Sequence, residues 1–431
     1  MMSNTPRSGI GRSFGFWTLT FLVVANMIGA GVFTTSGFTL ASLGDPWLVL
    51  LAWLMGGLIA LCGAFSYGLL VRRMPVSGGE YVFLSKAMHP FVGFVAGWVS
   101  LLAGFSGAIA FAAVALESYL PGSFPAKIPA AGVIVLGAFL HGAKRWFGAG
   151  VQNSAVILKL LLLVVFLGWG AFAIDWGSES SRSLESDGGL LAFAQALVWI
   201  SLSYSGFNAA VYVAGEATAP RVVARALIVG TGLVVLLYLF LNAVFVLGAP
   251  AAEIAGQADV AARAAKWIGG AGFEAFTRVV ISLALVTSVL SMMMAGPRVY
   301  GKMAEDGVIP KIFILRKDRV WPAVLLQMGL ALMLVFAGNL MELLSYLGLT
   351  LSLSAAVAVS SLFLGERVRG WAALPPALFV LATLGAATLL IAHDPWQALG
   401  TGITLALGAV AYRLINSRFN GLDGDADGDL E

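Results

Sequence analysis

Long runs of apolar residues, separated by short clusters of charged residues, proline or glycine, are the main pattern of this chain. A helix needs about 20 mainly apolar residues to cross the roughly 30 Å hydrocarbon core of a membrane. Twelve runs of suitable length occur, and they predict twelve membrane-spanning helices. The predicted spans cover residues 16–40, 47–71, 89–119, 128–143, 150–174, 190–214, 222–249, 273–303, 320–338, 341–365, 371–392 and 396–416.

The connections between these runs are too short to form a separate soluble domain. Residues 1–15 predict a short cytoplasmic segment without a small-residue cleavage site, so we expect the first apolar run to be retained and not removed as a signal peptide. Residues 417–431 alternate aspartate with small residues and predict a disordered, acidic cytoplasmic tail. The chain is therefore expected to be almost entirely membrane-embedded.

Composition supports this interpretation. Hydrophobic residues make up 59% of the 431 residues and charged residues 11%, against about 25% charged residues in soluble domains. The remaining polar surface is too small to cover a soluble core of that size, which argues against a soluble enzyme and against a nucleic-acid-binding protein. The single cysteine, Cys62, allows no disulfide within the chain and no cysteine cluster for a metal, and we expect no cofactor.

The distribution of lysine and arginine predicts the orientation. An even number of spans places both termini on the same side of the membrane. Most of the 25 lysine and arginine residues then lie on the side of the termini, and positive residues favour the cytoplasmic side. We therefore expect a multi-pass protein of the cell membrane with both termini in the cytoplasm.

The first apolar run contains glycines close to its middle, at Gly29 and Gly31. A glycine weakens a helix by roughly 1 kcal/mol, so the sequence predicts a break here. Inside a membrane, the backbone groups freed by a break are tolerated only where they are buried in protein or face a water-filled cavity. Close packing of a neighbouring helix against the glycines is the alternative explanation.

A break of this kind creates two half-helix ends of opposite dipole. The amides of Ala30, Gly31 and Val32 would face an anionic group from a helix N-terminus. The carbonyls of Met27 and Ile28 would accept hydrogen bonds from an ammonium group. Together the two ends are suited to a zwitterion.

The sixth apolar run repeats the feature at the same relative position. Its middle reads Leu202-Ser203-Tyr204-Ser205-Gly206-Phe207-Asn208, which predicts a second break, although serines bonded back to helical carbonyls would explain the composition as well. Paired breaks in two halves of a chain are typical of a substrate site near the middle of the membrane. Residues 16–174 and 190–365 are then expected to form inverted repeats, with 371–416 supplying two further helices.

Four segments resemble the amino acid/polyamine/organocation permeases. They are NMIGAGVF in the first run, RRMPVSGGEYVFLSKAMHPFVGFVAGW after the second, SYSGFNAAVYVAGEATAPR in the sixth and AGPRVYGKMAEDGVIP at the end of the eighth. The last four predicted spans match only in hydropathy. The resemblance implies an all-helical, LeuT-type fold of five plus five inverted helices with two more, and amino acid transport by alternating access.

The resemblance also implies a substrate site. The substrate carboxylate is expected on the amides of the first break, and the ammonium on carbonyls of both breaks. Many members carry serine where this chain has Ala30, and many have a bulky aromatic gate at the position of Leu202. Expected substrate-binding residues are Met27, Ile28, Gly29, Ala30, Gly31, Val32, Leu202, Ser203, Tyr204, Ser205, Gly206 and Asn208; expected gating residues are Tyr204, Phe207 and Phe105.

Lys159 lies about nine residues into the fifth predicted span, roughly 13 Å from its start. A cation at such depth is costly unless it is paired or faces a cavity; snorkelling toward the interface is the alternative. The resemblance places this lysine where sodium-coupled relatives bind Na⁺, next to first-helix carbonyls and to eighth-helix hydroxyls, here Ser288 and Ser291. The sequence leaves open whether Lys159 is a permanent strut or releases its proton during transport.

The positions of the acidic residues predict the charge of the substrate. No aspartate or glutamate lies in the interior of the first, third, sixth, eighth or tenth predicted span, and Asn208 occupies a place where some members with cationic substrates carry an acid. We therefore expect sodium-independent transport of neutral amino acids, as a proton symporter or an exchanger. Alternatives are a cationic amino acid or polyamine antiporter, a non-transporting receptor, a channel and an intramembrane enzyme.

Partners other than lipid and substrate are not expected. Relatives that carry a disulfide-linked heavy subunit use a cysteine between the third and fourth spans, and residues 117–129 contain none. The sequence therefore predicts a protein that works without a heavy subunit, as a monomer or a weak homodimer.

Overall fold

The computed structural model describes residues 14–122, 124–142, 149–173, 184, 189–315, 320–364 and 368–424. Within these ranges the chain is helical, and extended pairing is limited to an isolated bridge between Phe14 and Ala217. Residues 1–13 and 425–431, which belong to the predicted terminal segments, lie outside the described residues. The last helix runs to Gly424, so the first part of the predicted disordered tail is helical.

The helices range from a single turn to long rods, and short 3-10 or π segments (labelled η) interrupt or flank them. In chain order they are α1 (Phe16–Met27), α2 (Gly31–Leu43), α3 (Pro46–Arg73), α4 (Gly79–Ala87), α5 (Pro90–Val99), η1 (Ser100–Gly107), α6 (Ala108–Tyr119), α7 (Ile128–Gly142), α8 (Ala149–Ala173), α9 (Leu190–Tyr204), η3 (Ala209–Glu216), α10 (Pro220–Leu247), α11 (Ala251–Ile254), α12 (Val260–Glu305), η4 (Lys311–Phe313), α13 (Trp321–Ala337), α14 (Leu340–Ser360), η5 (Ser361–Phe363), η6 (Gly370–Ala373), α15 (Leu374–His393), η7 (Pro395–Ala398) and α16 (Leu399–Gly424).

Each predicted span coincides with helix in the described part of the chain. Within the described ranges, 8 helices are long and apolar enough to cross a membrane on their own, and the bent pair α1 and α2 raises the number to 9. Three further apolar helices are shorter: α7, the Ile157–Phe172 part of α8, and α13. The expectation of an all-helical, multi-pass membrane protein is therefore confirmed.

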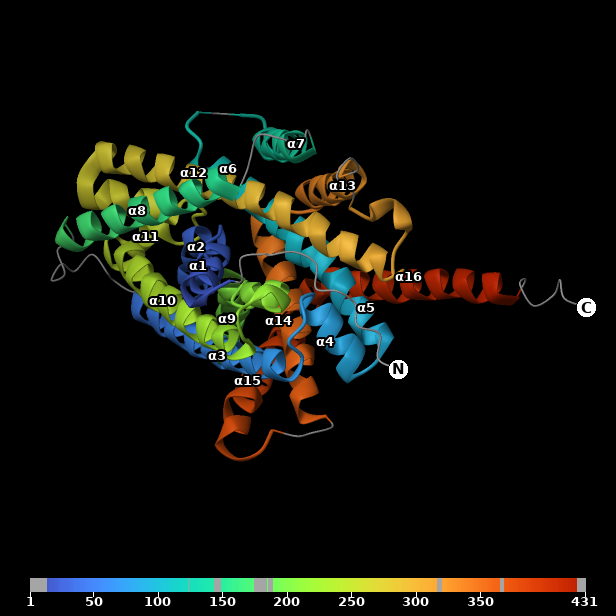
Figure 1. Cartoon of the computed structure of the whole chain (residues 1–431). Helices are drawn as coiled ribbons and strands as arrows, with labels where there is room; N and C mark the ends of the chain where they lie inside the picture. Colours follow the sequence, from blue (N-terminus) through green and yellow to red (C-terminus); the bar gives the residue numbers. More distant parts are fainter. Residues whose placement is uncertain are drawn as a thin grey trace, which may run out of the picture.

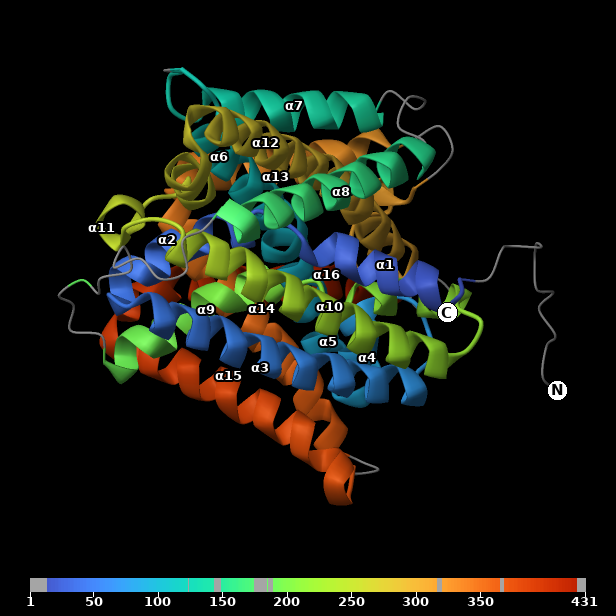
Figure 2. The same ribbon diagram turned by 90° about the vertical axis from the view of Figure 1, so that its left-hand side faces the viewer.

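The helices surround the first span. Figure 1 and Figure 2 show α1 and α2 inside the bundle, between α8 and α12 on one side and α3 and α10 on the other. All but two residues of α2 are buried. Lipid is as apolar as a leucine side chain, so no hydrophobic force drives such a helix toward the centre of the bundle. Close packing and polar contacts hold it there instead.

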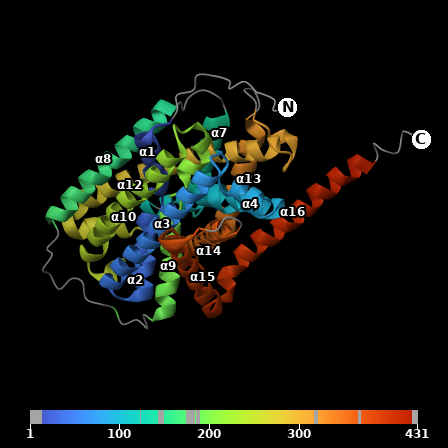
Figure 3. The ribbon, with the colours of Figure 1, turned by 60° about the horizontal axis from the view of Figure 1, so that its bottom comes forward.

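The C-terminal helix packs against α5 and α14 with its first part and leaves the bundle with its last part. Figure 3 shows α16 extending away from the other helices toward the C-terminus. Its apolar side chains Leu399, Ile403, Leu407, Val410 and Leu414 are exposed. An apolar surface of this kind is stable when it faces lipid, in agreement with a membrane location.

Two irregularities in α12 have local causes. Gly269 and Gly270 leave the helical conformation, and Gly270 has a φ of 70°, which favours glycine. The predicted span 273–303 begins just after this kink. The second irregularity is Pro297 inside the helix, which lacks an amide proton and cannot donate a helical hydrogen bond. In the same part of α12, the Gln327 side chain of α13 donates to the Met292 carbonyl at 2.9 Å.

The segment between α10 and the kink covers one end of α2. The Gly256 amide donates to the Gly37 carbonyl at 2.7 Å. A Cβ at Gly37 would overlap the Gln257 carbonyl oxygen, so glycine is required here by close backbone contact. Residues 250–272, which the sequence marks only as a connection, thus form a cap on the bundle.

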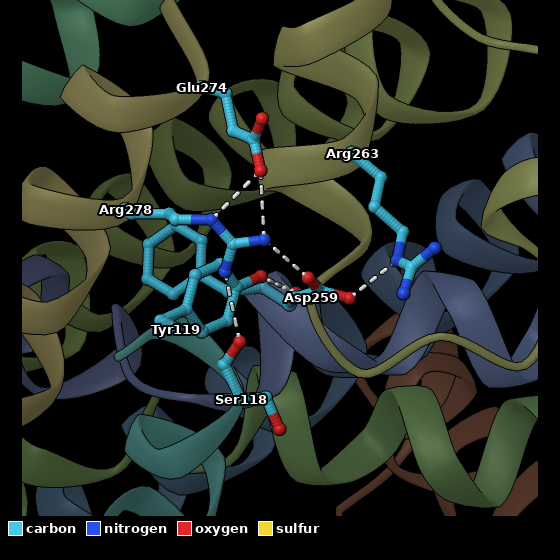
Figure 4. A network of polar contacts seen from close by, with 7 residues as sticks. Ser118, Tyr119, Asp259, Arg263, Glu274 and Arg278 are labelled. Atoms are coloured by element: carbon cyan, nitrogen blue, oxygen red, sulfur yellow. Dashed lines mark hydrogen bonds and ion pairs between the residues drawn. The ribbon is translucent and has the colours of Figure 1, made fainter. Parts of the chain in front are cut away.

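A network of charged side chains fixes this cap (Figure 4). The Arg278 guanidinium contacts Asp259 at 2.8 Å and Glu274 at 3.0 Å, and it donates to the Ser118 carbonyl at the end of α6 at 3.1 Å. Asp259 also pairs with Arg263 at 2.7 Å. The network therefore joins the start of α12, its main part after the kink, and α6.

Candidate functional site

The first span is broken at the predicted glycines. Helix α1 ends at Met27, α2 begins at Gly31, and the two are bent by 45°. No side chain caps the N-terminus of α2, so its first amides keep the capacity to bind a ligand. The uncapped N-terminus thus lies at residues 29–32, where the sequence predicts an anion-binding end, and its role in binding stays a prediction.

The sixth span is broken as well. Helix α9 ends at Tyr204 and η3 begins at Ala209. Between them Gly206 has a φ of 94°, in the left-handed region where glycine is favoured. The sequence prediction of a second interruption in residues 202–208 agrees with this geometry.

The two breaks lie side by side. Asn26 donates from its side chain to the Gly206 carbonyl at 3.4 Å, and Thr35 and Ser203 share a hydrogen bond of 3.2 Å. A Cβ at Gly31 would overlap the Ser203 hydroxyl and lie 2.8 Å from its Cα. Both explanations that the sequence offered for Gly31 therefore apply: the helix is broken there, and the neighbouring helix lies in close contact with it.

The carbonyl end of α1 is occupied by two protein donors. The Lys159 Nζ donates to the Ile28 carbonyl at 2.7 Å, and the Tyr238 hydroxyl donates to the Met27 carbonyl at 2.6 Å. Lys159 is buried, with 3% of its surface exposed. The buried ammonium therefore contacts the broken first span directly, without reaching the membrane surface.

The same contacts limit how an ammonium ligand can bind. A carbonyl oxygen has two lone pairs, so Met27 and Ile28 each retain one. The Leu202 carbonyl accepts from both the amide and the hydroxyl of Ser205, at 3.0 and 2.6 Å. Among these three predicted acceptors, the two in the first span are therefore better placed to receive a further donor.

The hydroxyls predicted to contact Lys159 lie on α12. The Ser288 hydroxyl donates to the Ala284 carbonyl, one turn earlier in its own helix, at 2.9 Å. Such a hydroxyl still has lone pairs with which it can accept from an ammonium. The participation of Ser288 and Ser291 stays a prediction.

The three predicted gating aromatics lie in different surroundings. Tyr204 is buried, and its hydroxyl donates to the Trp53 carbonyl of α3 at 3.1 Å. Phe207 packs against Tyr67, with ring centroids 5.3 Å apart. Phe105 lies on the π-helical η1; its ring contacts Tyr212 and Tyr300. Their role in gating stays a prediction.

One acidic residue at the second break is missed by the sequence argument. Glu80 of α4 is 7% exposed. Its Oε1 accepts from the Asn208 side chain at 3.2 Å and from the Tyr67 hydroxyl, and its Oε2 accepts from Ser354 of α14 at 2.7 Å. Burial raises the pKa of Glu80, although the three donors act in the opposite direction. Glu80 belongs to the SGGEY segment, but its spacing does not reveal that it points inward.

Further polar contacts hold α2 in place. The Trp53 indole donates to the Ser36 hydroxyl at 2.8 Å, and Ser36 donates to Asn242 of α10. The Tyr119 hydroxyl donates to the Phe33 carbonyl at 2.6 Å. Among the described residues, no group of three or more histidine, cysteine, aspartate or glutamate side chains is placed to hold a metal.

Comparison with known proteins gives matches over most of the chain. A family model described as amino acid permease matches residues 14–408. The serine/threonine exchanger SteT of Bacillus subtilis is 24% identical over 355 residues, which cover 78% of this chain and 79% of the exchanger.

Two human proteins are similar at the same level. The large neutral amino acids transporter small subunit 2 is 24% identical over 399 residues, which cover 85% of this chain and 72% of that protein. The cystine/glutamate transporter is 24% identical over 418 residues, which cover 91% and 83%. Residues 14–408, which the family model matches, contain both breaks and Lys159.

Proposed function

Because the chain belongs to the amino acid permease family, we propose that it carries neutral amino acids across the cell membrane by alternating access. The resemblance seen in its sequence motifs is confirmed by the family match. The observation that carries the proposal is the contact between the two breaks, at Asn26 and Gly206 and at Thr35 and Ser203. It brings an uncapped helix N-terminus and a carbonyl end to one place within the bundle.

The proposed architecture is the twelve-span, LeuT-type arrangement. Residues 16–174 and 190–365 form the two inverted repeats, and residues 371–416 add two helices. The breaks at matching places, the α1–α2 bend and the α9–η3 interruption, support this assignment. Both termini are proposed to lie in the cytoplasm, which places α4 on the cytoplasmic side.

The substrate is proposed to bind through its two charged ends. Its carboxylate accepts from the amides of residues 29–32, where the helix dipole favours an anion. Its ammonium donates to the Met27 and Ile28 carbonyls. Because backbone groups provide both contacts, Ala30 can replace the serine of many relatives with the loss of one hydroxyl contact.

A neutral side chain fits this site better than a charged one. Asn208 supplies an amide and no charge, and the names of two similar proteins, an exchanger of serine and threonine and a transporter of large neutral amino acids, support a neutral substrate. The buried Glu80 carboxylate beside Asn208 favours a cationic amino acid as second candidate. Because both of its oxygens already accept from protein donors, we place this candidate second.

Lys159 is proposed to replace a sodium ion. Its ammonium contacts the Ile28 carbonyl and links α8 to the broken first span. A fixed positive charge at this position disfavours binding of Na⁺ by repulsion. Transport is therefore proposed to be sodium-independent, as exchange or proton symport, and without a disulfide-linked heavy subunit, because Cys62 in α3 is the only cysteine.

Thermal unfolding of the purified protein in detergent tests the binding mode. A neutral amino acid at about 100 times its dissociation constant should stabilise the protein by roughly 2.7 kcal/mol. The N-acetyl derivative and the methyl ester of the same amino acid each lack one charged end and should give no shift. Stabilisation by either blocked form, or by lysine and agmatine but no neutral amino acid, would contradict the proposal.

A further inference from the structure

A buried carboxyl group joins four elements on the proposed cytoplasmic side. Glu80 of α4 accepts hydrogen bonds from Tyr67 of α3, from Asn208 at the second break and from Ser354 of α14. We call Glu80, Tyr67, Asn208 and Ser354 the Glu80 cluster. Its members are far apart in sequence, so only the packing of these helices brings them together.

All three hydrogen bonds to Glu80 come from uncharged side chains in the part of the chain described. A buried carboxylate without a cation is costly, and such a group tends to take up a proton. The hydroxyls of Tyr67 and Ser354 can each act as donor or acceptor. The cluster can therefore hold the carboxylate or, after rotation of one hydroxyl, the protonated acid.

The cluster lies where the structure must change during transport. It connects the second break, at Asn208, to α14 and α4, and alternating access moves such broken helices against their neighbours. We propose that Glu80 is a proton-binding site of this permease, and that the Glu80 cluster closes the cytoplasmic end of the transport path. The proposal rests on the function and orientation proposed above.

Few other titratable groups face Glu80. Tyr67 faces it from α3 and Tyr212 from η3, and Tyr212 interacts with the carboxylate electrostatically. On α4 itself, Tyr81 bonds to Asp306 instead, and Lys86 is exposed. At the neighbouring helix ends, Arg73 of α3 is exposed and donates to the Leu362 carbonyl, and His89 before α5 is exposed; α14 contributes the uncharged Ser354.

Proton binding and closure are linked. Burial in the closed cluster raises the pKa of Glu80, whereas opening returns the carboxyl to water and to its ordinary value. The closed form therefore binds the proton more tightly, and closing takes up a proton that opening releases. In the pH range between the two pKa values, each unit of rise in pH shifts the equilibrium between closed and open forms toward the open form by up to about tenfold.

Exchange of labelled amino acid in proteoliposomes, with equal pH on both sides, tests this coupling. The wild-type rate should change by at least about threefold between about pH 5 and pH 8. Glu80→Gln removes the titrating group and should make the rate independent of pH. Glu216→Gln, a change of an exposed acid in η3, is the matched control and should keep the wild-type profile.

For two milder variants, the proposal predicts the direction in which the midpoint of the pH profile moves. Tyr67→Phe and Ser354→Ala each remove a donor that stabilises the carboxylate, so each should raise the pKa of Glu80 further. The midpoint of the pH profile should then move to higher pH. A structural role alone does not predict this shift, and both variants remain informative if Glu80→Gln fails to fold.

Infrared titration of the purified protein provides a readout without transport. A stretching band of a protonated buried carboxyl should appear as pH falls and be absent in Glu80→Gln. An unchanged pH profile in Glu80→Gln, unmoved midpoints in both milder variants, or a band that survives in Glu80→Gln would overturn the inference. A band that titrates as expected in a protein without exchange activity would contradict the proposed function and leave the proton site standing.

Discussion

Lys159 is the residue whose position sequence reasoning predicted most closely. A lysine deep in an apolar run must find a partner, and the structure gives it the Ile28 carbonyl at 2.7 Å. Glu80 illustrates the opposite case. It is also buried, with 7% of its surface exposed, but it lies in a short helix between spans, and its partner Ser354 is 274 positions away. No local pattern encodes such a contact.

Removing the Lys159 charge should abolish transport. A hydrogen bond to a charged group contributes about 1.5–3 kcal/mol, so Lys159→Ala should reduce uptake by more than about tenfold while the protein remains folded. Uptake into proteoliposomes and the elution profile in size-exclusion chromatography measure the two effects. Lys266→Ala, at an exposed lysine of α12, is the control. Wild-type uptake by Lys159→Ala would refute the assigned role.

At the scale of elements, the sequence predicted the first break from Gly29 and Gly31 and the second from the stretch of serine and glycine at residues 203–206, since such residues weaken a helix inside an apolar run. The sequence did not reveal that Gly31 also contacts Ser203, or that the 250–272 connection folds into a cap on α2. Both contacts join segments far apart in the chain. The three gating aromatics were grouped by a family pattern, whereas the structure places Tyr204 and Phe207 against α3 and Phe105 against η3 and α12.

The contact between the cap and α2 can be tested with one methyl group. Gly37→Ala places a Cβ on the Gln257 carbonyl oxygen, and relief requires a backbone shift that costs about 1–3 kcal/mol. Thermal unfolding should therefore occur at lower temperature, with weaker substrate binding. Gly385→Ala in α15, where a Cβ meets nothing within 4 Å, is the matched control. Equal unfolding temperatures for the two variants would show that the close contact is absent.

At the scale of the whole molecule, composition and hydropathy were sufficient to predict an all-helical membrane protein. The pairing of the two breaks within one bundle required the structure, because hydropathy does not encode which spans are neighbours. The resulting site has a helix N-terminus for an anion, two carbonyls for a cation and a buried lysine behind them. This combination supports the proposal that a chain with so few charged residues binds a zwitterionic amino acid inside a membrane.

Counterflow tests the central claim most directly. Proteoliposomes loaded with an unlabelled neutral amino acid are diluted into sodium-free buffer that contains a trace of the labelled compound. The account predicts transient accumulation of label, which depends on the neutral amino acid inside and is lost when lysine or putrescine replaces it. No accumulation with any neutral amino acid, or accumulation only after sodium is added, would contradict the account.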